Sequence, residues 1–315
     1  MLTKVLPLSP ITTVLAALST TALLLVVGLV SLATAHPHHG ANAGDAVVQR
    51  INPTDPAALT ELLNRIEGNR VVMIGETHDR YGHHQNQLEV IRGLDQRGIP
   101  IAIGMEYFQR PFQPHLDDFV AGRIDEATLL QRTEWHERWR FDVELYRDIL
   151  SYAQQRRIPL VALNASSETV HAVSSNGIGG LDPDTRALFP RRIELAEGVY
   201  KEQLVSVFAM HGPMQRSHLQ RFLEVQYVWD QTMAATAGEF LNANPERTLV
   251  LLAGSGHLLH DDAIPSRLRR VHPGAQSVLV TDTGWLPPGA QPDYVMAARE
   301  LDPSHRQQLA AASSD

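Results

Sequence analysis

Side chains that can hold a metal ion or move a proton stand directly after four short apolar runs of the sequence. A carboxylate and an imidazole together can bind a divalent ion or work as a proton-transfer pair. The small residues beside them let backbone and ligand approach closely. Glu76 and His78 follow the first run, Glu106 the second, Asn164 the third and His257 the fourth. These residues are far apart in the sequence, so only the fold can bring them together.

The runs themselves are typical of strands in a parallel sheet. They are apolar throughout, as expected for strands that are covered on both faces. The stretch His83–Arg97 between the first two runs has apolar residues at helical spacing, and strand–helix–strand units predict parallel pairing with right-handed crossovers. The expected strands are Arg70–Ile74, Ile99–Ile103, Ile158–Leu163, Thr248–Leu252, Ser277–Val280 and, as a last edge strand, Tyr294–Met296.

The expected fold class is therefore α/β: a mainly parallel sheet flanked by helices, with a smaller helical lobe inserted. Ligands of open parallel sheets bind at the carboxyl ends of the strands, so we expect the polar residues to meet there, and His84 could project over the same edge. If the protein is a hydrolase, Glu76, His78, Glu106 and His257 are its candidate catalytic residues, and the same four could hold a divalent metal. Each residue also has a structural alternative. Glu76 and His78 could form an ordinary loop salt bridge, Glu106 could be a solvated turn carboxylate, and His257 could be a core histidine.

The N-terminal residues read as a signal peptide or an N-terminal anchor. Lys4 precedes an uncharged stretch, Ile11–Val30, and Ala33-Thr34-Ala35 supplies a cleavage pattern. If it is not cleaved, the stretch could nearly span a bilayer. Either way, we expect an exported protein of the periplasm or cell envelope. The expected organisation is 1–35 signal peptide or anchor, 36–48 flexible His-containing leader, 49–300 α/β domain with helical insertions at about 108–157 and 166–247, and 301–315 polar tail.

Composition excludes several classes of protein. The chain has 315 residues, of which 43% are hydrophobic and 20% charged, so it can form a globular core. It has no cysteine, which excludes disulfides, zinc–thiolate sites, iron–sulfur clusters and a lipid-anchored N-terminal cysteine. The net charge of −8 argues against general binding to nucleic acid. Fifteen histidines beside 27 lysines and arginines make metal or haem chemistry worth testing.

Five ordered segments resemble the ChaN-like haem-binding uptake family, part of the Tiki/TraB/erythromycin-esterase-like superfamily. The resemblance covers roughly residues 45 to 300, and the matches fall at the expected strand ends, which makes them fairly specific. The segments are Val72–Asp79 with His83–Gln87, Gly104–Phe108, Pro159–Ala165, Gln226–Asp230 with Met233-Ala234, and Gly254–His257.

The resemblance implies a bacterial envelope protein that binds haem or iron porphyrin and takes part in iron or haem uptake. It also implies a tyrosine as iron ligand and a homodimer in which two haems stack face to face. Relatives in the wider superfamily are hydrolases that use the positions matching Glu76, His78, Glu106 and His257. The resemblance therefore leaves both haem binding and hydrolysis open. Many members are lipoproteins, which a chain without cysteine cannot be. The candidate ligand-binding residues are Glu76, His78, His84, Glu106, Tyr107, Asn164, His257, Tyr200 and Tyr227.

Overall fold

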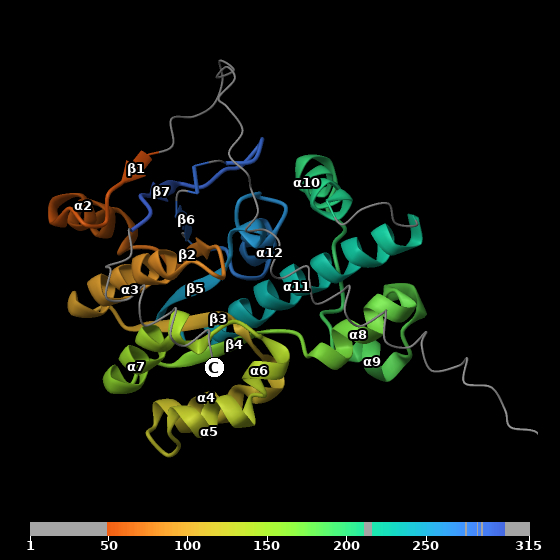
Figure 1. Cartoon of the computed structure of the whole chain (residues 1–315), viewed down its shortest axis with the longest axis horizontal. Coiled ribbons are helices and arrows are strands. Elements are labelled where there is room, and N and C mark those ends of the chain that lie inside the picture. The colour runs from red at the N-terminus through yellow and green to blue at the C-terminus, as the bar shows by residue number, and fades with distance from the viewer. Residues whose placement is uncertain (1–48, 211–215, 275, 282, 285, 300–315) are drawn as a thin grey trace, which may run out of the picture.

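The computed structural model describes residues 49–210, 216–274, 276–281, 283–284 and 286–299. Their strands form one seven-stranded sheet (Figure 1) in the order β1-β7-β6-β2-β5-β3-β4, and every pairing is parallel. The predicted α/β class is therefore confirmed. The strands are β1 (Gln49–Ile51), β2 (Val71–Glu76), β3 (Ile101–Gln109), β4 (Leu160–Asn164), β5 (Thr248–Gly254), β6 (Gln276–Thr281) and β7 (Tyr294–Met296).

The strand predictions are right except at one edge of the sheet. Tyr294–Met296 is a strand, but it lies between β1 and β6 and is not an edge strand. The edge is β1, which pairs with β7 from Gln49↔Tyr294 to Ile51↔Met296. No pattern in the sequence indicated β1, because its three residues are too few to show an apolar run.

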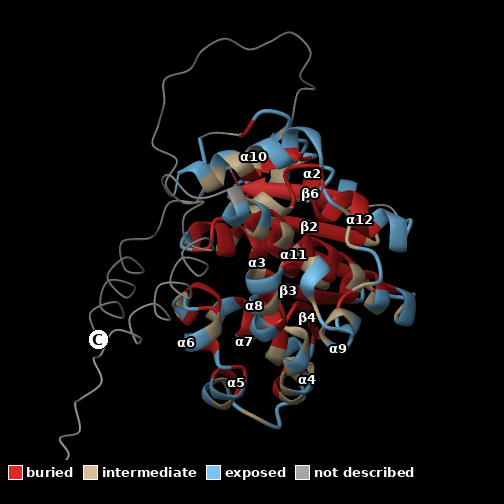
Figure 2. Ribbon diagram, turned by 90° about the vertical axis from the view of Figure 1, so that its right-hand side faces the viewer, coloured by how far each residue is buried: buried red, intermediate tan, exposed pale blue. Residues whose placement is uncertain are grey.

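One face of the sheet is covered by helices from the first half of the chain. Alternate side chains of β2 point to opposite faces: Val72 and Ile74 pack with these helices, and Val71 and Met73 face the other way. Figure 2 shows the strands as the most deeply buried part of the molecule. The helices on this face are α2 (Pro56–Ile66), α3 (Tyr81–Gln96), α4 (Gln113–Val120), α5 (Glu126–Arg132), α6 (Trp135–Arg138) and α7 (Arg147–Arg156).

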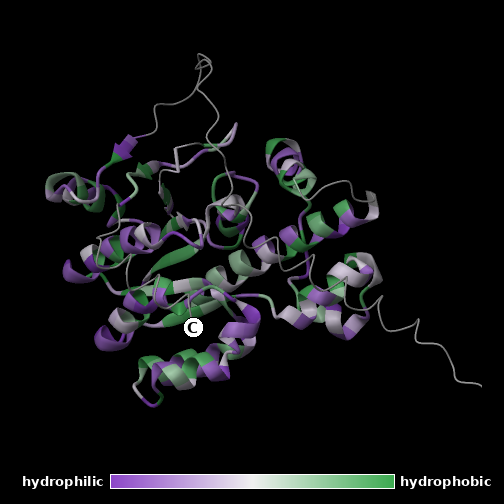
Figure 3. Ribbon diagram, in the orientation of Figure 1, coloured by the Kyte–Doolittle hydropathy of each residue, from purple (hydrophilic) through white to green (hydrophobic). Residues whose placement is uncertain are grey.

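The opposite face is covered by α11 (Arg216–Ala243) and α12 (Ile264–Val271). Met233, Ala237 and Leu241 of α11 pack against β5 and its neighbours. The N-terminal half of α11 extends past the sheet (Figure 1) and carries a small lobe made of α8 (Ser167–Asn176), α9 (Pro183–Ala187) and α10 (Gly198–Ala209). In Figure 3 the strands are the most consistently apolar elements, while the surrounding helices mix apolar and polar residues.

The topology creates a crevice at the carboxyl end of β5. The chain leaves β2 for α3 on one face, whereas it leaves β5 for α12 on the other. β5 lies between β2 and β3 in the sheet. Adjacent strands whose connections diverge in this way open a ligand crevice at a topological switch point.

Some predictions fall outside the described residues. The signal peptide or anchor, the His-containing leader and the polar tail all lie there, and the domain boundaries stay predictions. Among the residues that the structure describes, no helix is both long enough and apolar enough to cross a membrane.

Candidate functional site

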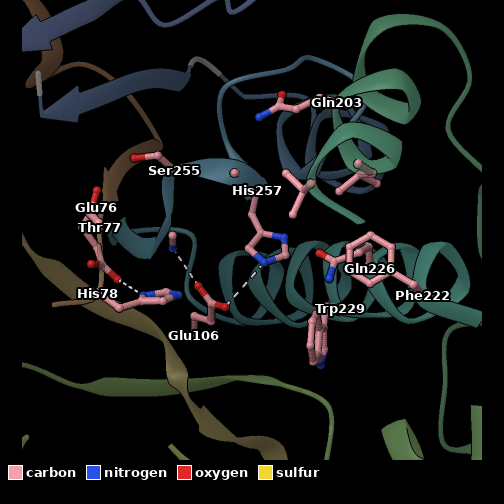
Figure 4. Close-up of a pocket in the computed structure, with 14 residues that line it drawn as sticks. Glu76, Thr77, His78, Glu106, Gln203, Phe222, Gln226, Trp229, Ser255 and His257 are labelled. Carbon is pink, nitrogen blue, oxygen red and sulfur yellow. Dashed lines mark hydrogen bonds and ion pairs between the residues drawn. The ribbon is translucent and has the colours of Figure 1, made fainter. Parts of the chain in front are cut away.

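Three adjacent strands bring their polar residues to one cavity. Glu76 is the last residue of β2, and His257 ends a single 3-10 turn, Ser255–His257, that directly follows β5. Glu106 lies in β3 where the register with β4 shifts after Met105, and such a bulge re-aims side chains. Figure 4 shows these groups facing a cavity of about 70 Å³, with α11 as its far wall.

The first carboxylate–imidazole pair joins Glu76 and His78. The His78 Nδ1 hydrogen-bonds to Glu76 Oε1, and the Glu76 carboxyl is 1% exposed. Burial by itself raises the pKa of Glu76, but the imidazoles of His78 and His84 outweigh it, so that pKa lies below its ordinary value. Burial lowers the pKa of His78, but Glu76 more than compensates and the pKa is raised. The pair therefore favours its charged forms.

The second pair joins His257 and Asp230 of α11. The His257 Nδ1 lies 2.6 Å from Asp230 Oδ1, and the Tyr200 hydroxyl donates to Asp230 Oδ2 at 2.7 Å. On its other side, the His257 Nε2 lies 3.5 Å from Glu106 Oε1. Glu106 Oε2 accepts the backbone N–H of Gly254 at 2.7 Å. This chain of contacts connects α10, α11, β3 and β5.

Charge at His257 follows from its neighbours. Burial lowers the pKa of the imidazole, but the carboxylates of Glu106 and Asp230 outweigh it and raise the pKa to about 9. His257 is therefore an imidazolium at neutral pH, with its Nδ1–H fixed by Asp230. A carboxylate behind a histidine commonly sets the orientation of its other nitrogen.

Four of the nine predicted ligand-binding residues line the cavity: Glu76, His78, Glu106 and His257. His84 lies behind them, with its Nε2 3.1 Å from the His78 carbonyl oxygen and 3.7 Å from Glu76 Oε2. Burial, above all other causes, lowers the pKa of its imidazole.

The other four predicted residues do not line the cavity. Asn164 is buried at the end of β4, where its Oδ1 accepts the backbone N–H of Ala165. Tyr107 packs among Tyr146, Trp139 and His84 on the face covered by α3 and α7. Tyr200 and Tyr227 are also buried, and the Tyr227 hydroxyl donates to the Ala196 carbonyl. Their assignment as ligand-binding residues stays a prediction.

The metal prediction finds no support. Glu76, His78, Glu106 and His257 do not form a ligand set; within the described parts of the chain, no three histidine or carboxylate side chains are arranged to hold a metal ion. The physical reason is pairing: the Nδ1 of each imidazole is bound to a carboxylate, and Glu106 is shared between Gly254 and His257.

Sequence reasoning placed two polar residues of α11, Gln226 and Asp230, in a family motif but did not assign them to the site. Asp230 is fully buried and Gln226 is 6% exposed. They are four residues apart, so they share the helix face that meets the cavity. A pattern in the sequence could have indicated them: the two polar side chains have helical spacing and lie between the apolar residues Val225, Val228 and Met233.

Comparison with known proteins defines the class. The family model for haem-binding uptake proteins of the Tiki superfamily, ChaN, matches residues 62–268, which is more than half of the chain. The chain belongs to this family, and the resemblance seen in its motifs is confirmed.

Solved structures share the fold at low identity. ChaN of Campylobacter jejuni, described with cofacially bound haem, superposes with a TM-score of 0.62 at 16% identity, over 80% of this chain and 100% of that chain. A variant of the erythromycin esterase EreC in its open conformation gives a TM-score of 0.47 at 15% identity, over 72% of this chain and 73% of the other.

A curated plant protein is also similar. RETICULATA-RELATED 5, a chloroplastic protein of Arabidopsis thaliana, is 26% identical over 128 residues. The match spans 38% of this chain but only 17% of the plant protein's length.

Gly254 supplies space for His78, which gives a first prediction. A Cβ at Gly254 would lie 2.9 Å from His78 Cε1 and 3.2 Å from its Nε2, although the backbone there suits any residue. Gly254→Ala is expected to displace the imidazole and to lower the free energy of unfolding by about 1–3 kcal/mol. Gly256→Ala is the matched control, since a Cβ there has no atom within 4 Å. Equal urea-unfolding midpoints for the two variants would contradict the prediction.

The raised pKa of His257 makes part of the stability depend on pH. Its folded pKa, about 9, lies above the ordinary value of 6.5, so the stabilisation is complete below pH 6.5 and is lost as the pH rises through 9. Asp230→Asn is expected to reduce the free energy of unfolding by about 3–5 kcal/mol at pH 6, and by clearly less above pH 9.5.

Urea unfolding across this pH range measures the effect. Asp261→Asn is the control, because it removes an exposed partner of Arg269, and such surface pairs contribute little. If Asp230→Asn lowers the free energy of unfolding by the same amount at pH 6 and at pH 9.5, the buried pair is not ionised.

Proposed function

We propose that this protein binds haem or an iron porphyrin in the bacterial cell envelope and takes part in iron or haem uptake. Membership of the haem-binding uptake family carries the proposal. A surface suited to a porphyrin ring beside the strand-end cavity supports it.

The porphyrin ring has to lie outside the cavity. Pockets that enclose a drug-sized ligand measure ~300–1,000 Å³, whereas this cavity measures about 70 Å³. The ring needs a flat apolar surface at the cavity mouth instead. Helix α10 offers one together with Met210, the residue after its end: Val199, Gln203, Val207 and Met210 follow at spacings of four, four and three, so they form one stripe, in which Gln203 is the polar member. Gln203 and Val207 line the cavity, which places the stripe at its mouth.

Exposure supports this choice of surface. Among the described residues, five large apolar side chains are exposed, and two of them, Val199 and Met210, belong to the stripe. A third, Leu195, precedes α10. Exposed apolar residues that gather on one element, in place of scattering singly, mark binding surfaces.

The iron ligand is a separate question. Burial, above all other causes, raises the pKa of Tyr107 and Tyr200 well above 10 and that of Tyr227 to about 12, so the phenolate that iron prefers is disfavoured at all three. A tyrosine ligand would require its helix to move on binding. Tyr200 lies on α10 and Tyr227 on α11. We therefore propose that these two helices move when the porphyrin binds.

Location and assembly rest on sequence features. The uncharged stretch Ile11–Val30 and the Ala33-Thr34-Ala35 pattern support export to the periplasm or cell envelope. A homodimer that joins two copies through the α10 stripe would cover its exposed apolar residues.

Titration with hemin tests haem binding. The Soret band is expected to shift and to saturate at a stoichiometric ratio. Val199→Glu combined with Met210→Glu places two carboxylates on the stripe and should weaken binding at least about tenfold, because charges are costly beside an apolar ring.

The matched control adds the same two negative charges outside α10. Leu188→Glu combined with Val271→Glu replaces two exposed apolar residues outside α10 and should leave the titration unchanged. Absence of a Soret shift in the unaltered protein would refute haem binding. Equal weakening by both double variants would refute the stripe as the binding surface.

Hydrolysis is a second candidate function, favoured by the two carboxylate–imidazole pairs that face one cavity. In this alternative His78 or His257 removes a proton from water, while Glu76 and Glu106 orient it. The proton on His257 has a consequence: this imidazole acts as a base only when the pH exceeds about 9.

Release of acid from 4-nitrophenyl acetate tests hydrolysis. If His257 is the base, the rate rises with pH through about 9, and His257→Asn lowers it by ~100-fold or more. His136→Asn, which alters an exposed histidine, should have no effect. A rate that is equal in both variants would exclude His257 from the chemistry.

A further inference from the structure

Gln226 is a buried polar side chain without a partner. It is 6% exposed and lines the cavity from α11, yet its amide hydrogen-bonds to no residue in the described parts of the chain. The amide has two donors and one acceptor oxygen, so it can pair with a ligand that has both functions.

Two imidazoles complete the polar lining. His78 uses its Nδ1 for Glu76, and its Nε2 has no partner among the described residues. The Nε2 of His257 faces Glu106 at 3.5 Å, which is too long for a strong hydrogen bond. In Figure 4 the Gln226 amide lies beside the His257 ring, and His78 lies at the strand side of the cavity.

The charge of the surroundings selects against anions. Glu76, Glu106 and Asp230 supply three carboxyl groups against the two imidazoles of His78 and His257, so acidic groups outnumber basic ones. The three carboxyl residues are each 5% exposed or less. A carboxylate or phosphate that entered would meet like charge at low dielectric, whereas an uncharged group would not.

The size of the cavity sets the size of the group. A water molecule needs about 10–15 Å³ by this measure of volume, so about 70 Å³ holds a handful of water molecules or one group of four or five heavy atoms. Beyond the polar end, Leu204, Val207, Phe222 and Trp229 form an apolar wall. The ligand therefore has a small polar end and an apolar body.

We propose that the cavity is a binding site for a small uncharged group of the carboxamide type, with Gln226 pairing with its carbonyl and N–H. His257 donates to the carbonyl oxygen, and the apolar wall holds whatever extends outward. The site lies inside the cavity, whereas the proposed porphyrin surface lies on α10 at its mouth; the two share Val207, and the test below is made without haem.

Acetamide and acetate test the proposal as a matched pair, because they have the same shape and differ in charge. The full-length protein, labelled with ¹⁵N in histidine, is titrated with each at pH 7 while the Nε2 resonances of His78 and His257 are followed. Acetamide is expected to shift both Nε2 resonances along a saturable curve. Acetate is expected to bind at least about tenfold more weakly. Acetate that binds as tightly as acetamide, or no saturable shift with either, overturns the proposal.

Variants on α11 assign the effect to Gln226. Gln226→Leu should weaken acetamide binding about tenfold or more, and Gln226→Asn, which keeps the amide, should retain part of it. Gln220→Leu is the control, since Gln220 is exposed on the same helix and its amide donates to Glu224. Unchanged binding in both Gln226 variants overturns the role of this residue. Folding of each variant is verified from the remaining histidine resonances.

Discussion

Burial of three carboxylates at one end of the sheet is the constraint from which the rest of the site follows. An ionised carboxyl in a protein interior is unfavourable unless a charge and hydrogen bonds compensate it. Glu76 meets this need with His78, Asp230 with His257 and Tyr200, and Glu106 with the Gly254 N–H and His257. Each imidazole consequently has one nitrogen fixed and the other directed at the cavity.

The same constraint explains why distant segments are held together. Asp230 belongs to a helix that covers one face of the sheet, while His84 belongs to a helix on the other. Their contacts with His257 and Glu76 cross the carboxyl ends of the strands. Gly254 has to be glycine because His78 occupies the place of its side chain. Electrostatic pairing and packing therefore specify one arrangement jointly, which is the usual role of a buried polar network.

Much of the fold was predictable because buried parallel strands are apolar throughout. That pattern placed Glu76, Glu106 and His257 at strand ends, and the strand-end rule brought them together. It does not indicate β1, which is too short, and it does not show that Tyr107 lies outside the cavity. Adjacent residues of a strand face opposite sides, so Tyr107 cannot share the cavity with Glu106. Asp230 was missed because no rule of strand ends applies to a helix, and its burial depends on how α11 packs.

The site combines two environments that suit different parts of a ligand. Within the cavity, paired charges and the Gln226 amide form a polar, nearly enclosed space that is too small for a ring system. At its mouth, the α10 stripe exposes two apolar side chains, Val199 and Met210. Tyr200 connects the two, because it lies next to Val199 of the stripe and donates to Asp230, which orients His257. A ligand that moves α10 would therefore change the position of His257, and occupation of the cavity would in turn restrain α10. Since such coupling is reciprocal, ligands at the proposed porphyrin surface and in the cavity are expected to influence each other through α10 and the Tyr200 hydroxyl.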